Sequence, residues 1–286
     1  MMAGADPASS PRALGTRRSE LALRVASALV LVPLAIATAY VGGWAFAVFW
    51  GAAALGVFWE WTALVAGAAR RAVLAAGATS VLLAVVLAAG GYRLVALAVL
   101  AAGMLAAAVL GPADRRLWSA GGVPYAGAIG IAPVVLRADH EEGFLAVIFL
   151  FAVVWATDII AYFVGRAFGG PKLMPRVSPK KTWSGALGGT LAAALAALAV
   201  AELGGLAGWY AIAALAVVLS VMAQGGDLFE SFLKRRFGAK DSSHLIPGHG
   251  GLMDRLDGFV AAGVVAALVG LARGGLDAPA RGLLVW

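Results

Sequence analysis

Stretches of about 20 apolar residues recur along almost the whole chain, and they constrain its fold more than any other feature. A segment of that length crosses a hydrocarbon core of roughly 30 Å as an α-helix, because a helix satisfies its own backbone hydrogen bonds. Hydrophobic residues make up 62% of the 286 positions and charged residues only 13%, which excludes a soluble globular domain and intrinsic disorder. A membrane β-barrel would show short alternating segments instead. The sequence therefore predicts an all-α polytopic membrane protein.

The apolar segments predict about nine transmembrane helices. They lie near residues 25–43, 44–66, 72–90, 93–111, 120–136, 143–165, 184–203, 206–224 and 258–273. The fifth segment contains Pro124 and Pro133, which lack backbone donors, so eight spans or one re-entrant segment stay open as alternatives. We divide the chain into a disordered cytoplasmic tail (1–20), N-terminal transmembrane helices (21–136) and a C-terminal transmembrane region with the polar loops (137–286).

The distribution of basic residues predicts the orientation of the chain. Lys and Arg are enriched in the cytoplasmic loops of membrane proteins. With a cytoplasmic N-terminus, all basic residues fall on the inner side except Arg93, Arg137, Arg273 and Arg281. The net charge of +7 then reflects topology and contact with anionic lipid headgroups, and does not indicate nucleic-acid binding. We expect a multi-pass protein whose N-terminus is cytoplasmic.

Two inner loops are long and polar. The second of them, residues 225–257, mixes carboxylates with cations and contains the turn Gly248-His249-Gly250-Gly251. Asp254 and Asp257 have a spacing that brings two oxygen ligands onto one helical face. Carboxylates in a chain without cysteine favour Mg²⁺ or Mn²⁺, whereas the basic residues and the glycine turn suit phosphate oxygens. For the basic run alone, a solvated loop that touches lipid headgroups is an equal alternative.

The first polar loop, residues 166–183, contains Ser178-Pro179-Lys180-Lys181-Thr182-Trp183 just before an apolar span. Hydroxyls and lysines at a helix N-terminus form an anion site. Asp158 lies inside the sixth span, about 10 Å from its inner end, where a carboxylate faces a polar cavity or a cation. The chain contains no Walker-type Gly-x-x-x-x-Gly-Lys-Ser/Thr motif, which excludes a P-loop site. For Glu60, between two tryptophans of the second span, we favour an interfacial carboxylate that snorkels to the membrane surface.

The second polar loop closely resembles the signature of the phosphatidate cytidylyltransferases, the CDP-diacylglycerol synthases. The shared positions are Gly226-Asp227-Leu228, Glu230-Ser231, Lys234-Arg235, Lys240-Asp241, Pro247-Gly248-His249-Gly250-Gly251, Asp254-Arg255 and Asp257. The Ser178–Trp183 run and Asp158 agree with the family, and the resemblance covers residues 140–273. Two positions depart from it, namely Ser184, where an acid is frequent, and Thr157, where Asn is frequent.

The resemblance implies transfer of the cytidylyl group of CTP to phosphatidate, which gives CDP-diacylglycerol and pyrophosphate at a polar site on the cytoplasmic side of a bacterial-type inner membrane. It implies Mg²⁺, in two divalent or mixed metal sites, with the ligands Asp158, Asp227, Asp254 and Asp257. The implied catalytic residues are Asp227, Asp254, Asp257 and Lys181. The implied substrate-binding residues are Ser178, Lys180, Thr182, Lys234, Arg235, Lys240, Asp241, His249, Gly250 and Arg255. CTP, phosphatidate and membrane lipid are the expected partners, nucleic acid is not, and a homodimer stays open.

Other functions remain as alternatives. A CTP-dependent lipid kinase would share part of the substrates but would release CDP and a phosphorylated lipid. A cytidylyltransferase acting on ether lipids would perform the same chemistry, and the sequence does not distinguish acyl from ether chains. A transporter could use an intramembrane aspartate together with basic inner loops, although paired half-repeats are not visible. Product analysis separates the lipid kinase from the cytidylyltransferase.

Overall fold

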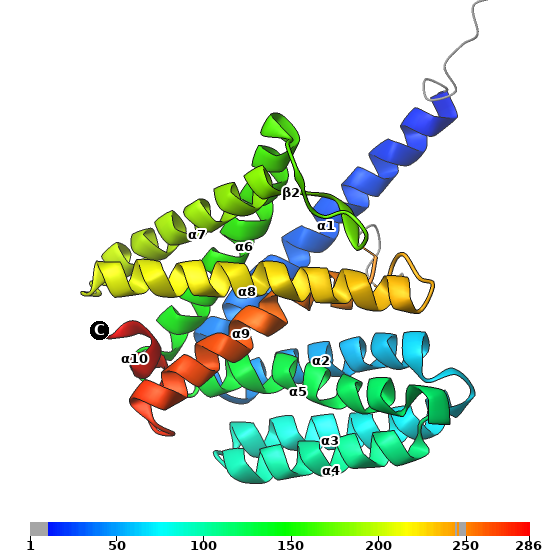
Figure 1. The fold of residues 1–286 in the computed structure, drawn as a ribbon. Coiled ribbons are helices and arrows are strands. Elements are labelled where there is room, and N and C mark those ends of the chain that lie inside the picture. Colours follow the sequence, from blue (N-terminus) through cyan, green and yellow to red (C-terminus); the bar gives the residue numbers. More distant parts are fainter. Residues whose placement is uncertain (1–10, 244, 246–249) are drawn as a thin grey trace, which may run out of the picture.

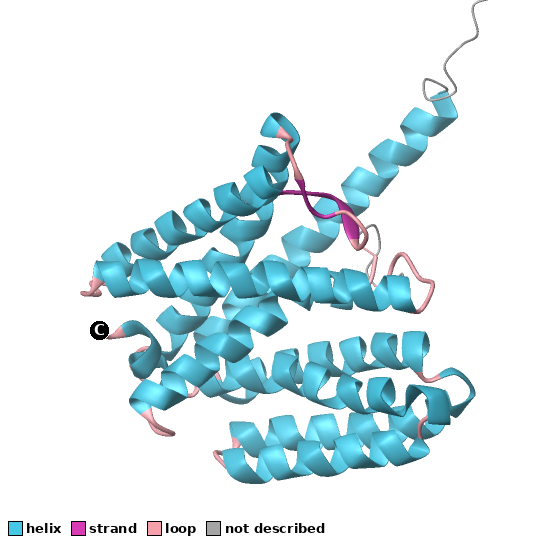
Figure 2. Ribbon diagram, viewed as in Figure 1, coloured by secondary structure: helices cyan, strands magenta, loops and turns pink. Residues whose placement is uncertain are grey.

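The structure is a computed structural model that describes residues 11–243, 245 and 250–286. It is a bundle of long helices (Figures 1 and 2). The helices are α1 (Pro11–Val41), α2 (Gly43–Val65), α3 (Arg70–Ala89), α4 (Arg93–Leu110), α5 (Arg116–Arg137), α6 (Gly143–Phe168), α7 (Trp183–Leu203), α8 (Trp209–Arg236), α9 (Met253–Gly274) and α10 (Pro279–Leu284). Two short 3-10 helices, η2 (Gly67–Ala69) and η3 (Ala113–Arg115), precede α3 and α5.

The helices coincide with the predicted apolar segments. In the described part of the chain, eight helices are long and apolar enough to cross a membrane, and Val25–Val41 of α1 forms a shorter apolar segment. The prediction of an all-α polytopic membrane protein is confirmed. One boundary differs, because α1 begins at Pro11 and residues 11–20 of the predicted disordered tail are helical. Proline is favoured in a first helical turn, and Ala, Leu and Arg are good helix formers.

Helix α5 resolves the alternative that its prolines left open. It is continuous from Arg116 to Arg137 with Pro124 and Pro133 inside it, so the segment is a full-length helix and not a re-entrant one. It packs against α2, α3, α4 and α9, and it is the most enclosed of the candidate spans. Small residues allow this close packing: an added Cβ at Gly127 would lie only 2.6 Å from Leu100 Cδ1.

An antiparallel hairpin in the first polar loop was not predicted. Strand β1 (Lys172–Met174) pairs with β2 (Ser178–Thr182), with Lys172 opposite Thr182 (Figure 2). Such short strands carry too little alternation to be read from sequence. Thr182 ends the hairpin and caps α7, because its Oγ1 accepts a hydrogen bond from Gly185 N at 3.2 Å. The hairpin is thereby fixed to the start of α7.

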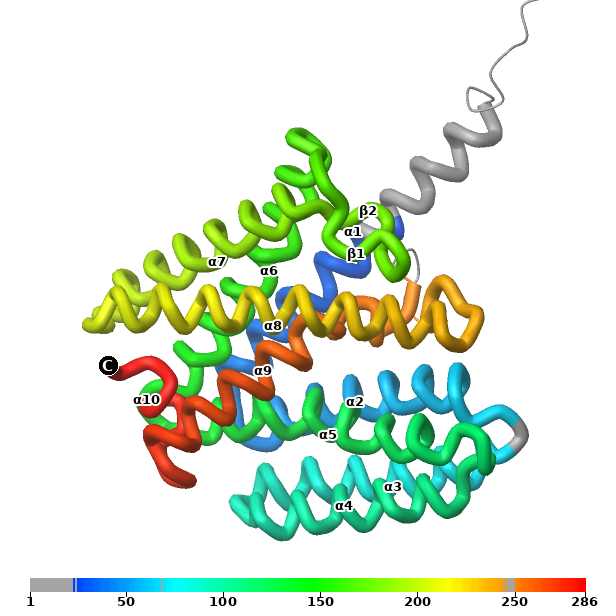
Figure 3. The backbone as a smooth tube through the Cα atoms, viewed as in Figure 1, coloured from blue at the N-terminus to red at the C-terminus, as the bar shows by residue number. Residues whose placement is uncertain are grey.

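Helix α9 joins the two halves of the bundle. It packs against α8 and α6 of the C-terminal half and against α5 and α2 of the N-terminal half. Trp50 of α2 stacks on Phe259 of α9 with ring centroids 4.6 Å apart. Figure 3 shows that the hairpin, the end of α8 and the start of α9 lie at the same end of the bundle. This is the end where the polar residues gather.

Candidate active site

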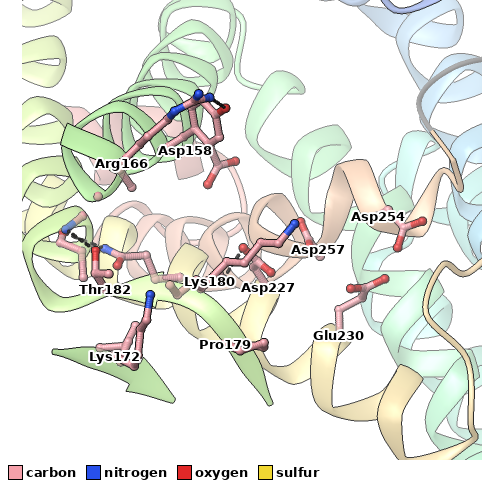
Figure 4. A pocket seen from close by; sticks show the side chains of 18 of the residues that line it. Asp158, Arg166, Lys172, Pro179, Lys180, Thr182, Asp227, Glu230, Asp254 and Asp257 are labelled. Carbon is pink, nitrogen blue, oxygen red and sulfur yellow. Dashed lines mark hydrogen bonds and ion pairs between the residues drawn. The ribbon is translucent and has the colours of Figure 1, made fainter. Parts of the chain in front are cut away.

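A polar cavity of about 800 Å³ opens among α6, α8, α9 and the β1–β2 hairpin (Figure 4). Acidic and basic side chains line it together. The charged lining residues are Asp158, Arg166, Lys172, Lys180, Lys181, Asp227, Glu230, Lys234, Asp241, Asp254, Arg255 and Asp257. Because these residues come from loops and helices far apart in the chain, the fold creates a charge density that no single segment has.

Three carboxylates face the cavity from three different helices. Asp158 comes from α6, Asp227 from α8 and Asp257 from α9, and Figure 4 shows them around one space. Lys181 of β2 forms an ion pair with Asp227, and both side chains remain partly accessible, at 24% and 31%. Asp257 Oδ1 accepts one hydrogen bond, 2.7 Å long, from Gly258 N. We call Asp158, Asp227 and Asp257 the cavity acids.

A glycine contact brings two of the cavity acids together. An added Cβ at Gly226 would collide with the backbone oxygen of Asp257, so only glycine lets α8 approach α9 this closely. From the other side, an added Cβ at Gly258 would lie 3.1 Å from Ala223 O. The glycine that precedes Asp227 and the glycine that follows Asp257 therefore set the separation of the two helices at the site.

A second group of acids, Glu230 and Asp254, is held by Lys234 and by backbone donors, while Glu230 Oε1 has no hydrogen-bond partner among the described residues. Lys234 Nζ lies 2.7 Å from Glu230 Oε2 and 2.5 Å from Asp254 Oδ1. The other oxygen of Asp254, Oδ2, accepts hydrogen bonds from Ser242 N at 3.2 Å and from Gly251 N at 2.9 Å. Asp254, which we predicted as a metal ligand, thus has both oxygens occupied, one of them by backbone N–H groups. Asp227 also has partners at both oxygens, Lys181 at Oδ2 and Ser231 Oγ at 3.5 Å from Oδ1, but both partners are side chains.

Glu60 belongs with this second group, and the prediction of a snorkelling carboxylate is wrong. Its side chain is 0% exposed, and it accepts hydrogen bonds from Ser242, Ser243, Leu252 and Met253. We call Glu60, Glu230 and Asp254 the anchor acids. No local pattern could have identified this role of Glu60, because its partners lie far along the chain; its presence in an otherwise apolar span was the available signal.

The predicted site residues divide into those that line the cavity and those that do not. The lining contains Asp158, Lys180, Lys181, Thr182, Asp227, Lys234, Asp241, Asp254, Arg255 and Asp257. Within the described residues, the lining leaves out Ser178, Arg235, Lys240 and Gly250. His249 lies outside the described residues. Arg235 and Lys240 are exposed to solvent beyond the cavity. Glu230, Arg166 and Lys172 were not among the predicted site residues, although Glu230 belongs to the recognised signature.

A helical membrane bundle whose cavity sets carboxylates against lysines and arginines is typical of enzymes that act on phosphate groups. The sequence profile of the family described as "Cytidylyltransferase family" matches residues 22–272. The phosphatidate cytidylyltransferase of Brucella abortus biovar 1 (strain 9-941) is 44% identical over 255 residues, covering 88% of this chain and 94% of the relative. The chain belongs to the cytidylyltransferase family, which confirms the resemblance seen in its loops, and it is an enzyme.

Two more distant relatives match shorter parts. The phosphatidate cytidylyltransferase of Rickettsia typhi (strain ATCC VR-144 / Wilmington) is 37% identical over 143 residues, which cover 46% of this chain and 61% of the relative. That of Haemophilus influenzae (strain ATCC 51907 / DSM 11121 / KW20 / Rd) is 42% identical over 132 residues, which cover 43% of this chain and 45% of the relative.

Proposed function

We propose that this protein transfers the cytidylyl group of CTP to phosphatidate and releases pyrophosphate, which makes CDP-diacylglycerol for phospholipid biosynthesis. The observation that carries the proposal is the cavity in which Asp158, Asp227 and Asp257 face Lys180 and Lys181. The 44% identity to a phosphatidate cytidylyltransferase supports the choice of both substrates. The cavity lies at one end of the helices, where a lipid phosphate at the membrane surface and a soluble nucleotide can meet.

The reaction needs charge neutralisation more than it needs a base. A phosphate oxygen of the lipid attacks the α-phosphorus of CTP, a new P–O bond forms, and the bond to the leaving pyrophosphate breaks. The attacking oxygen is already ionised near neutral pH, so the protein has to position two anionic groups and offset their repulsion. Lys180, Lys181 and Arg255 line the cavity and supply positive charge for this purpose. Arg166 and Lys172 extend the basic rim towards the hairpin.

We propose that the cavity acids contribute ligands to a divalent metal ion, Mg²⁺. They present only oxygen ligands, which hard cations prefer. Three carboxylates around one space repel each other, and the ion pair of Lys181 with Asp227 offsets only part of their charge. When bound there, one or two such ions would neutralise phosphate charge and align the reacting groups. Asp254 accepts hydrogen bonds from the backbone N–H groups of Ser242 and Gly251 and pairs with Lys234, and we propose that it holds the cavity wall instead.

We propose an inner-membrane location with the N-terminus and the cavity on the cytoplasmic side. In Figure 1 the end of α8 and the start of α9 lie at one end of the bundle, whereas the C-terminus and α10 lie at the other. Most basic residues lie in the segments that the sequence assigns to the same side as the end of α8 and the start of α9, as expected for cytoplasmic loops. CTP would then reach the cavity from the cytoplasm and phosphatidate from the surrounding membrane lipid.

The test is incorporation of labelled CTP into lipid by the purified protein in detergent, with phosphatidate and Mg²⁺ present or withheld. We expect CDP-diacylglycerol and pyrophosphate, and we expect both to disappear when the metal is chelated. A phosphorylated lipid together with CDP would overturn the proposal in favour of a lipid kinase. No turnover with any lipid acceptor would overturn it in favour of a transporter.

A further inference from the structure

Glu60 is a fully buried carboxylate in the N-terminal half of the chain, far in sequence from every segment of the recognised signature. Helix α2 places it at 0% exposure between Trp59 and Trp61. Burying a charged group is costly unless hydrogen bonds replace its hydration. Here Oε1 accepts from Leu252 N at 2.8 Å and Ser243 Oγ at 2.5 Å, while Oε2 accepts from Met253 N at 2.6 Å and Ser242 Oγ at 3.1 Å. All these donors are neutral.

The two backbone donors belong to the start of α9. The first N–H groups of a helix have no partner within the helix and need an outside acceptor. Leu252, at the position before the first helical residue, has a hydrocarbon side chain that cannot accept a hydrogen bond. The carboxylate of Glu60 takes this role from a different helix, and its negative charge suits the positive end of the α9 dipole.

The same carboxylate is connected to the cavity wall through one hydroxyl. Ser242 Oγ lies 3.1 Å from Glu60 Oε2 and 3.1 Å from Asp254 Oδ2. Asp254 in turn pairs with Lys234 of α8. A continuous series of polar contacts therefore runs from Glu60 of α2, through Ser242 and Asp254, to Lys234 of α8.

Two glycines lie where α2 and the residues just before α9 pack closely together. An added Cβ at Gly56, one helical turn before Glu60, would lie 2.8 Å from Leu252 Cδ2. An added Cβ at Gly251 would lie 3.0 Å from Glu60 Oε1 and 3.0 Å from Asp254 Oδ2. An added Cβ at Gly251 would also collide with Ser242 Oγ, so a side chain at Gly251 would displace the groups that connect the two carboxylates.

We propose that Glu60 is a positioning residue for cytidylyl transfer. It fixes the first turn of α9, and that turn carries Asp254, Arg255 and Asp257 into the cavity wall. The N-terminal half of the chain thereby sets the geometry of the reaction that the C-terminal half performs. The inference rests on the proposed function for its readout, but the cap itself can be measured without turnover.

The first test is Glu60→Gln. The variant keeps the size of the side chain but turns an amide donor towards a backbone donor of Leu252 or Met253, so the helix start loses an acceptor. We expect kcat at saturating substrates to fall about 10- to 100-fold, as is usual when an orienting partner is removed. We expect the KM for CTP to change less than about threefold, because the groups that bind the nucleotide remain.

The matched control is Thr62→Val in the same helix. Thr62 is also buried, and its Oγ1 donates only locally, to Trp59 O at 2.9 Å. Its replacement removes a buried polar group from α2 without touching the start of α9. We expect kcat of this control to stay within about threefold of wild type even where its stability falls by about 1 kcal/mol.

The second readout is hydrogen exchange of the peptide that covers residues 250–257. We expect about tenfold faster exchange there in Glu60→Gln and no change in Thr62→Val, because local opening frees the amides at the start of α9. Wild-type kcat in Glu60→Gln, or a lower kcat with unchanged exchange at 250–257, would overturn the proposal.

Glu60→Asp serves where Glu60→Gln does not fold. It keeps the charge but is one methylene shorter, and we expect an intermediate loss of kcat with faster exchange at 250–257. Full activity with slow exchange in Glu60→Asp would show that the length of the Glu60 side chain is not required, which would contradict the proposal. Failure of the proposed function is recognised separately, because the wild-type protein would then form no CDP-diacylglycerol, whereas failure of the positioning role leaves product formation intact in the variants.

Discussion

The cavity acids and the anchor acids have the same chemistry but opposite surroundings. Asp158, Asp227 and Asp257 are accessible from the cavity and face lysines. Glu60 is 0% exposed and Glu230 1% exposed, and backbone groups, hydroxyls or Lys234 surround the anchor acids. A carboxylate that is buried away from solvent and held by backbone donors or by a buried lysine stabilises structure, whereas one that is accessible from the cavity can bind a metal ion or interact with a substrate. The predictions below test that division.

The largest effect is expected for Asp257→Asn. The substitution keeps the shape but removes one negative ligand from the cavity, and we expect kcat to fall about 100- to 1,000-fold with retained folding. CTP incorporation into lipid and thermal unfolding in detergent measure the two quantities. The control is Asp114→Asn, an exposed acid whose side-chain ion pair is with the adjacent Arg115. Near-normal turnover in Asp257→Asn would remove this residue from the catalytic set.

Lys181→Gln should have the next largest effect. The lysine pairs with Asp227 and lines the cavity, so its loss removes positive charge beside the phosphates. We expect kcat/KM for CTP to fall about 10- to 100-fold, which corresponds to one hydrogen bond with a charged group. Arg176→Gln, an exposed residue of the same hairpin loop, is the control. Equal losses in both variants would mean that general attraction of the anionic nucleotide, and not the contact of Lys181, is being measured.

The helices, the cavity acids and the signature acids Glu230 and Asp254 were accessible to sequence analysis, and the role of Glu60 was not. Runs of apolar residues are contiguous in sequence, so the spans could be placed directly. The signature residues Asp227 and Asp257 carried a family pattern. Glu60 meets donors 182 to 193 positions further along the chain, so only the packing of α2 against α9 reveals its role. Likewise, Arg235 and Lys240 match the signature, but the structure leaves them outside the cavity.

Asp254→Asn separates the two groups of acids most sharply. Lys234 loses one of its two charged partners and keeps Glu230, and the side chains of Lys234 and Asp254 are only 13% and 10% exposed. We therefore expect the folded state to lose about 2 kcal/mol. We expect about tenfold lower kcat through displacement of the α9 start, with an unchanged Mg²⁺ concentration for half-maximal activity. Titration of activity with Mg²⁺ measures both kcat and the Mg²⁺ concentration for half-maximal activity. A raised Mg²⁺ requirement, like that expected for Asp227→Asn, would make Asp254 a metal ligand and move it to the cavity acids.

The smallest effect is expected for Ser242→Ala. The hydroxyl lies 3.1 Å from Glu60 and 3.1 Å from Asp254, yet it has only one proton and can satisfy one carboxylate fully at a time. The backbone N–H of Ser242 still donates to Asp254 in the variant, and Glu60 keeps both backbone donors of α9. The loss is therefore one hydrogen bond to a carboxylate, about 1.5 kcal/mol of stability. Because the start of α9 keeps its acceptor, we expect kcat to fall only about threefold. A loss as large as that of Asp257→Asn would show that the hydroxyl contacts the reacting groups. Ser242 would then belong to the catalytic site together with the cavity acids.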